Sequence, residues 1–200
     1  MNLKSRVLEW APVYRAWQAP FQTKKFSPIF EHNAMDGVRR VLDVGCGPGT
    51  NASYFLECEY LGIDINSGYV ASASRRYGRD FIVADVTTYE VVGEPFDFIL
   101  VNSFFHHVTD EETHRILRHL GTLLHEGGHI HILDLILPER RSIARALARW
   151  DRGEHPRSPS HWREIFQVHF EPVVFQPYSL GLGGVTLWNM VYFKGAPRHS

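Results

Sequence analysis

Three glycines at alternate positions follow an apolar run in the segment VLDVGCGPGT, residues 41–50. Gly45, Gly47 and Gly49 lack a Cβ atom, so the backbone of this turn can approach a bound molecule closely. The apolar residues before the turn predict a buried β-strand. Because ligands of α/β proteins bind beyond the carboxyl ends of parallel strands, the pattern predicts a nucleotide-type site at this turn.

Two aspartates end the next two apolar runs. Asp64 follows the run YLGI, where a carboxylate can accept hydrogen bonds from both hydroxyls of a ribose. Asp85 follows the run DFIVA and brings a second acid to the same edge. Asp64 could instead cap the following helix, where Asn66 also offers a cap, and Asp85 could belong to an ordinary turn. Their joint occurrence after successive strands favours a binding site.

This ordered set of glycines and acids resembles the class I S-adenosylmethionine-dependent methyltransferases, specifically the small bacterial methyltransferase-domain type. The resemblance extends over about residues 38–134, and Cys46 and Pro48 depart from the family pattern only within its tolerance. It implies S-adenosyl-L-methionine as cofactor and S-adenosyl-L-homocysteine as product. It also implies a cofactor-binding set that consists of Asp43, Gly45, Cys46, Gly47, Gly49, Asp64, Ile65, Asp85, Val86, Asn102 and Ser103.

The family pattern gives each part of the cofactor a partner. Asp64 would bind the ribose, Asp85 with Val86 would bind adenine, and Asn102 and Ser103 would lie where the fourth strand reaches the methyl-transfer region. The cofactor has no phosphate, so amides of the glycine turn and the N-terminus of the first helix, near residues 50–52, would donate to its carboxylate. Carbonyl groups of the same turn would accept from its ammonium. No His, Asp or Glu triple has metal-ligand spacing, so no metal is expected.

Two histidines are the candidate proton acceptors. His106 and His107 follow the fourth strand directly, in the segment NSFFHHV, and a histidine there could take a proton from an acceptor hydroxyl or amine near neutral pH. Packing or hydrogen bonding within the loop is the alternative interpretation. His114, His119, His125, His129 and His131 are interpreted as structural.

Aromatic and basic residues are the candidate contacts for the methyl acceptor. Aromatic rings could accommodate the cationic sulfonium and a flat acceptor, and arginines of the segment WDRGEHPRSPSHW could pair with an anionic acceptor. Ion pairing that fixes the loop explains the arginines equally well. The expected acceptor contacts are Tyr14, Trp17, Phe104, Arg152 and Arg157.

Short strands that alternate with helical stretches predict a parallel sheet with right-handed crossovers. A capping box of Thr109 and Glu112 starts a helix that Gly127 and Gly128 should stop. The predicted strands span residues 39–44, 60–64, 80–84, 96–102 and 128–135, followed by an antiparallel hairpin of 171–178 and 184–193 joined at Gly181, Gly183 and Gly184. We therefore expect an α/β, Rossmann-like class I methyltransferase fold, with a seven-stranded mostly parallel sheet, helices on both faces and a C-terminal antiparallel hairpin.

Length and composition favour one domain over residues 1–200, with an N-terminal helical cover at 1–36 and a substrate-facing insertion at 136–165. The formal net charge of −1 provides no field that would recruit nucleic acid or an anionic membrane. The two cysteines give no disulfide framework, and no stretch has the apolar length of a membrane span. These features predict a cytoplasmic protein, and both a monomer and a homodimer stay open.

The predicted function is methyl transfer from S-adenosylmethionine to a small molecule, which could carry an anionic or aromatic group. The acceptor atom, oxygen, nitrogen or carbon, stays open. One alternative is an RNA or protein methyltransferase, although these usually have N-P-P-Y or D-P-P-Y after the fourth strand, where this chain has NSFF. A second alternative is a non-catalytic subunit that binds the cofactor. A nicotinamide-dependent oxidoreductase is disfavoured, because its third glycine would follow the second after three positions.

Overall fold

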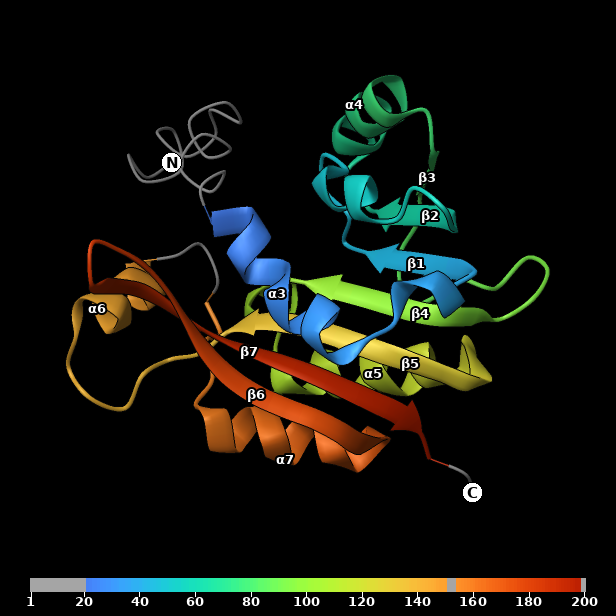
Figure 1. Ribbon diagram of the computed structural model, residues 1–200. Helices are drawn as coiled ribbons and strands as arrows, with labels where there is room; N and C mark the ends of the chain where they lie inside the picture. Colours follow the sequence, from blue (N-terminus) through green and yellow to red (C-terminus); the bar gives the residue numbers. More distant parts are fainter. Residues whose placement is uncertain (1–20, 151–153, 199–200) are drawn as a thin grey trace.

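The computed structural model describes residues 21–150 and 154–198, apart from the side chain of residue 150. One seven-stranded sheet runs through them in the order β3-β2-β1-β4-β5-β7-β6 (Figure 1). All neighbouring pairs from β3 to β5 are parallel, and β7 is antiparallel to both β5 and β6. The predicted fold class is therefore confirmed. The strands are β1 Arg40–Val44, β2 Glu59–Asp64, β3 Asp80–Val83, β4 Phe96–Asn102, β5 Leu124–Leu135, β6 Phe170–Leu182 and β7 Val185–Pro197.

Helices cover both faces of the sheet (Figure 1). The side chains of β4 alternate between the two faces, with Ile99 and Val101 in one core and Phe98 and Leu100 in the other. The first core includes residues of helices α5 (Asp110–Thr122) and α7 (Pro159–His169). The second includes residues of α3 (Gln22–His32), α4 (Ser67–Tyr77) and the short 3-10 helix η3 (Thr50–Tyr54). The remaining helical elements are α6 (Ile143–Trp150), η2 (Met35–Gly37) and η4 (Phe105–His107).

The boundary between α5 and β5 differs from the prediction. The capping box is confirmed, since the Thr109 hydroxyl accepts from the amide of Glu112 and the Glu112 carboxylate accepts from the amide of Thr109. The helix nevertheless ends at Thr122, and β5 starts at Leu124, opposite Phe96 of β4. Leu117, Leu120 and Leu124 have the spacing of one helix face, but pairing of Leu124 with the first residue of β4 overrides that spacing, and both Gly127 and Gly128 lie inside the strand.

The hairpin of β6 and β7 is longer than predicted and turns over two residues. Gly183 and Gly184 have φ values of 58° and 81°, which is the left-handed pair that a type I′ turn requires. Gly181 belongs to β6 instead of the turn. The long hairpin carries β6 along the outer edge of the sheet, beside α3 (Figure 1).

The described part of the predicted N-terminal cover is α3, which packs Phe26 and Ile29 into the core. The helix continues through Pro28, which has no N–H for the carbonyl of Lys24, and the Ser27 hydroxyl donates to that carbonyl at 3.0 Å instead. Residues 1–20, with the predicted acceptor contacts Tyr14 and Trp17, lie outside the described residues.

The predicted substrate-facing insertion, 136–165, divides into two different parts. Helix α6 buries Ala144 and Ala148, packs Ala148 against residues of β5, β6 and β7, and contacts β7. In contrast, α7 is a core helix whose Trp162 is fully buried and donates from its indole N–H to the carbonyl of Leu135. The expectation of a substrate-facing element is therefore wrong for the part that α7 forms.

Candidate active site

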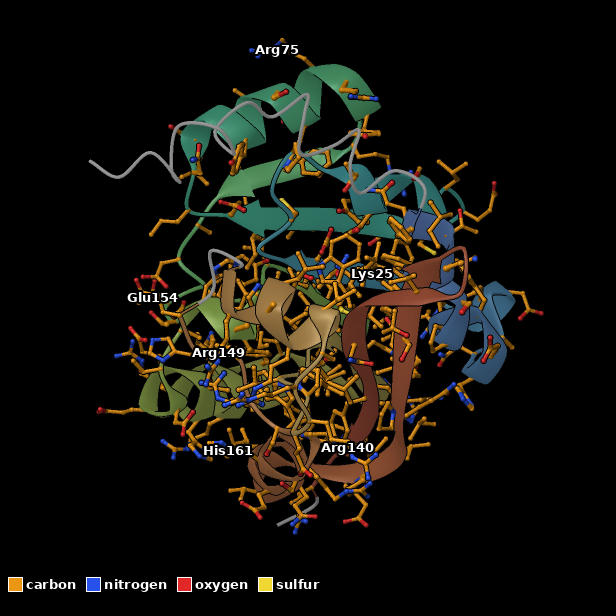
Figure 2. The ribbon with its side chains drawn as sticks, turned by 90° about the vertical axis from the view of Figure 1, so that its left-hand side faces the viewer. Lys25, Arg75, Arg140, Arg149, Glu154 and His161 are labelled. Atoms are coloured by element: carbon orange, nitrogen blue, oxygen red, sulfur yellow. The ribbon has the colours of Figure 1, made fainter. Side chains whose placement is uncertain are left out.

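The parallel strands β1, β4 and β5 end on one side of the molecule, the left of Figure 1, and Figure 2 looks on to that side. The glycine turn follows β1 there, with φ values of 64°, 54° and 78° at Gly45, Gly47 and Gly49. A Cβ atom on Gly45 would lie 2.6 Å from the ring of Phe104, so this position requires glycine. Phe104, predicted as an acceptor contact, thus lies against the glycine turn.

Asp64 is held at the end of β2 by two backbone amides. Its Oδ2 accepts from the amide of Gly47 and its Oδ1 from the amide of Asn66, both at 2.8 Å. Each carboxylate oxygen has a further acceptor position for a hydroxyl group. Asn66, not Asp64, is the N-cap of α4, because its side chain accepts from the amides of Gly68 and Tyr69. The helix-cap interpretation of Asp64 is therefore wrong.

Asp85 follows β3 in a turn that its own side chain stabilises. Its Oδ1 accepts from the amide and the hydroxyl of Thr87, both at 2.8 Å, and these hydrogen bonds lower the pKa of the carboxyl. The carboxylate is exposed, whereas the adjacent Val86 is buried. Ile65 is 74 % exposed and presents apolar surface next to Asp64. The turn interpretation of Asp85 is thus correct, and it leaves the carboxylate accessible.

A buried hydrogen-bond network lies beneath the glycine turn. Asp43 is fully buried and accepts from the Tyr60 hydroxyl at 2.5 Å and from the amide nitrogen of Asn51 at 3.0 Å. Burial raises the pKa of Asp43 to about 7, although the hydrogen bonds from Tyr60 and Asn51 oppose the shift. The carboxylate of Asp43, a predicted cofactor-binding residue, has a buried, supporting position, and no sequence pattern indicates Asn51 or Tyr60.

The same network fixes the orientation of Asn102 at the end of β4. Because the Asp43 carboxylate accepts, the Asn51 amide must turn its nitrogen toward Asp43 and its oxygen toward Asn102. The nitrogen of Asn102 donates to that oxygen at 3.0 Å. The remaining atom, Asn102 Oδ1, is buried and has no hydrogen-bond partner among the described residues. Because buried polar atoms are nearly always hydrogen-bonded, this oxygen favours a ligand that donates a hydrogen bond to it.

His106 and Asp134 form a buried pair beyond β4 and β5. His106 Nδ1 lies 2.6 Å from Asp134 Oδ1, and both side chains are at most 4 % exposed. Asp134 also accepts from the amides of Phe105 and Leu135. Burial would raise the pKa of Asp134, but the His106 ring and these hydrogen bonds outweigh it and lower the pKa. Asp134 is therefore a carboxylate that fixes the His106 ring. His107 is exposed, and its ring lies 4.1 Å from that of His106.

Arg157 does not have the substrate position predicted for it. The residue is 4 % exposed, and its guanidinium donates to the carbonyls of Phe105 and Val108 and to the carboxylate of Asp110. It also donates to the Thr113 hydroxyl. Five donors in a fixed fork suit this task, which is to hold the loop after β4 against α5. The ion-pair interpretation is the correct one here, and Arg152 lies outside the described residues.

Ser103 connects the edge of the sheet at which the parallel strands end to helix α3 of the N-terminal cover. It is the one described non-glycine residue with positive φ, at 56°, a conformation that costs about 1–3 kcal/mol and is concentrated at functional sites. Its hydroxyl accepts from Lys25 Nζ of α3 at 2.6 Å. Lys25 lies near the middle of the face in Figure 2, and no sequence motif singled it out.

The helix expected after the glycine turn is the five-residue 3-10 helix η3, so an α-helical N-terminus is not present there. Cys46 is buried beside the turn, and burial raises the pKa of its thiol above the usual range. Among the described residues, no cluster of His, Cys, Asp and Glu side chains is arranged to hold a metal ion. None of the described helices combines the length and the apolar character that crossing a bilayer requires.

Comparison with known proteins identifies the family. Residues 41–128 match a family model described as a methyltransferase domain. An uncharacterized methyltransferase of Mycobacterium tuberculosis is 30 % identical over 142 residues, which cover 68 % of this chain and 71 % of that protein. The crystal structure of a protein from Pyrococcus horikoshii OT3 superposes with a TM-score of 0.72 at 15 % identity, covering 96 % of this chain and 99 % of that one.

A second solved structure has a named activity. The N-methyltransferase NodS of Bradyrhizobium japonicum WM9, in complex with S-adenosyl-L-homocysteine, superposes with a TM-score of 0.65 at 16 % identity, over 99 % of this chain and 94 % of that one. Both structural likenesses concern the fold. Together with the relative's identity, the glycine turn and the two aspartates, they show that this chain is an enzyme of the class I S-adenosylmethionine-dependent methyltransferase family.

Proposed function

We propose that this methyltransferase acts on a hydroxyl or an amine of a small molecule and that His106 accepts the proton. The observation that carries the proposal is the buried pair of His106 and Asp134 at the ends of β4 and β5, next to Asn102. Burying a carboxylate is costly unless it is paired, and buried titratable pairs are concentrated at functional sites. A methyl acceptor whose hydroxyl or amine loses a proton requires a base, and this pair can act as that base.

The residues of the edge fit the cofactor in three places. Asp64, oriented by two amides, suits the ribose hydroxyls, and the accessible Asp85 suits the amine of adenine. The buried Oδ1 of Asn102 suits the ammonium of the amino-acid end, because it is an acceptor without a donor among the described residues. When bound, S-adenosylmethionine supplies a methyl group on a positively charged sulfur.

The remaining residues have positioning and proton-transfer tasks. With its proton on Nδ1, His106 donates to Asp134, and its Nε2 then carries the lone pair that accepts the proton of the methyl acceptor. Asp134 holds the ring orientation and stabilises the imidazolium that results. Phe104 packs against Gly45 and helps to keep water from this end of the turn.

Three observations support a small acceptor over RNA or a protein. The chain after β4 reads Asn102-Ser103-Phe104-Phe105 in place of N-P-P-Y, and the net charge is −1. In addition, α3 covers part of the edge, because Lys25 Nζ donates to Ser103 and the Tyr178 hydroxyl donates to the carbonyl of Lys25. A covered edge favours an acceptor of small size.

The test is a release assay for S-adenosylhomocysteine with a panel of small phenols, aliphatic alcohols, amines and carboxylic acids. We expect turnover with a hydroxyl or amine compound, and we expect His106→Gln to lower kcat by about 100-fold while the Kd for S-adenosylhomocysteine stays unchanged. The matched control is His161→Gln, a half-exposed histidine that pairs with the surface residue Asp110. Full turnover of His106→Gln, or activity with carboxylic acids alone, would contradict a proton-accepting role, and no turnover at all would favour a non-catalytic subunit.

A further inference from the structure

We propose that Lys25 of α3 binds the carboxylate at the amino-acid end of the cofactor. The inference rests on the cofactor site proposed above and adds a residue that lies outside the glycine motif and its acids. The observation that carries it is the 2.6 Å contact between Lys25 Nζ and Ser103 Oγ, at the residue that follows β4.

The order of the strands fixes the direction of the cofactor along the edge. Asp85 follows β3 and Asp64 ends β2, so the adenosine occupies the β3–β2 side. The amino-acid end must then extend past β1 toward β4, which is the next strand in the sheet. Neighbouring strands lie about 4.8 Å apart, so one strand spacing separates the glycine turn from Asn102 and Ser103. Lys25 Nζ is at that end of the path.

The structure after the glycine turn lacks a long α-helix whose dipole would attract the carboxylate of the cofactor. Family resemblance predicted that a helix N-terminus after the glycine turn would attract it, but η3 is a short 3-10 helix without the dipole of a long α-helix. A lysine ammonium has three N–H donors and a full charge, and one of the donors contacts Ser103. Lys25 therefore replaces the expected helix dipole as the source of positive charge.

The two polar groups around Ser103 match the two charges of an amino acid. Asn102 Oδ1 is a buried acceptor, which suits the ammonium, and Lys25 is a cation, which suits the carboxylate. Ser103 follows Asn102 directly in the chain and contacts Lys25 through its hydroxyl, and its positive φ is a conformation that non-glycine residues rarely adopt.

The backbone that carries Lys25 is anchored to the hairpin. The carbonyl of Lys25 accepts from the Tyr178 hydroxyl of β6 at 2.8 Å, and Asn33, which follows α3, donates to the Tyr192 hydroxyl of β7 at 2.9 Å. Helix α3 is thus tied to the hairpin at the lysine itself and just after the C-terminal end of the helix. A positioned cation loses less entropy on binding than a lysine on a free surface loop does.

Two ligands that differ only in the carboxylate test the proposal directly. S-adenosylmethionine and decarboxylated S-adenosylmethionine are titrated by calorimetry into the wild-type protein, Lys25→Met and the control Lys24→Met, which removes an exposed lysine of the same helix. We expect the wild-type protein to prefer S-adenosylmethionine by at least about 10-fold, which is the lower end for a hydrogen bond to a charged group. We expect Lys25→Met to lose this preference while it binds the decarboxylated ligand as the wild type does, and Lys24→Met to behave as the wild type.

Each other outcome has one meaning. Equal weakening of both ligands in Lys25→Met would assign the lysine to fixing α3 and overturn the proposal, as would an unchanged preference. Absence of a preference in the wild-type protein would also overturn it. Failure of the wild-type protein to bind either ligand would reject the proposed cofactor site itself, so this result is distinct from failure of the lysine inference.

Discussion

The carboxylates beyond β2 and β3 are held by backbone amides of their own turns and, for Asp64, also of the neighbouring glycine turn, whereas the polar groups beyond β4 and β5 are held by side chains from distant parts of the chain. Asp64 and Asp85 accept from amides of Asn66 and Thr87, two residues away in sequence. In contrast, His106 meets Asp134 across 28 residues and Ser103 meets Lys25 across 78. The adenosine side of the edge is therefore built by contacts within one turn or between neighbouring turns. The methyl-transfer side depends on contacts between distant parts of the chain.

This difference predicts where substitutions are tolerated. A change at Asp64 or Asp85 removes a ligand contact and leaves the sheet intact, since both side chains lie at the surface of the edge. A change at Arg157 or Asp43 removes the support of the site and lowers the stability of the protein, because both are buried.

The largest expected effect is on the support of the loop after β4. Replacing Arg157 by Met leaves the buried carbonyl of Phe105 with only the amide of Val108 as donor, and it removes the guanidinium from the carbonyl of Val108 and from the carboxylate of Asp110. We expect the free energy of unfolding to fall by about 3–5 kcal/mol, measured by urea denaturation. Arg118→Met, at an exposed position of α5, should change it by less than about 0.5 kcal/mol. Equal stability of the two variants would mean that the loop does not depend on Arg157.

The next effect depends on pH and concerns Asp43. Its pKa in the folded protein is about 7, above the value of 3.8 for an unperturbed carboxyl, so the folded state binds this proton more tightly than the unfolded state. The stability that this group contributes is therefore complete below about pH 4 and is lost as the pH rises toward 7.

We expect the wild-type protein to lose up to about 3 kcal/mol from this group between pH 5 and pH 8, at 1.36 kcal/mol for each pH unit. Asp43→Asn, which cannot ionise, should not show this loss, so the difference between the two unfolding free energies isolates it from the histidines. A difference that stays constant with pH would contradict a buried carboxyl that titrates near neutrality.

The two sides of the edge also differ in how well their residues could be predicted from the sequence. The glycine turn, Asp64 and Asp85 each follow an apolar strand, and strand ends can be located from local pattern alone. Lys25, Asn51, Tyr60 and Asp134 have their positions through contacts with residues far away in sequence, so no spacing indicated them.

The errors in the predicted fold and site have the same physical origin. Leu123 and Leu124 have helical spacing, but pairing of Leu124 with Phe96 turns the second of them into the start of β5. Arg157 lies in a segment rich in turn residues, which predicts an exposed loop, yet its carbonyl accepts from the amide of Leu137 and its side chain is enclosed by the loop after β4. In each case a tertiary contact decides between two outcomes that the local sequence allows equally.

The most direct test of this account is titration of S-adenosylhomocysteine into the wild-type protein, Asp64→Asn and His106→Gln. We expect the wild-type protein to bind with a low-micromolar Kd, about −8 kcal/mol. Asp64→Asn should weaken binding by about 1.5–3 kcal/mol, because the bonds to the ribose lose their charge, and His106→Gln should bind as the wild type does. Binding that is lost in His106→Gln and unchanged in Asp64→Asn, or a preference of the wild type for NAD, would contradict the assignment of the adenosine part of the cofactor to the β3–β2 side of the edge.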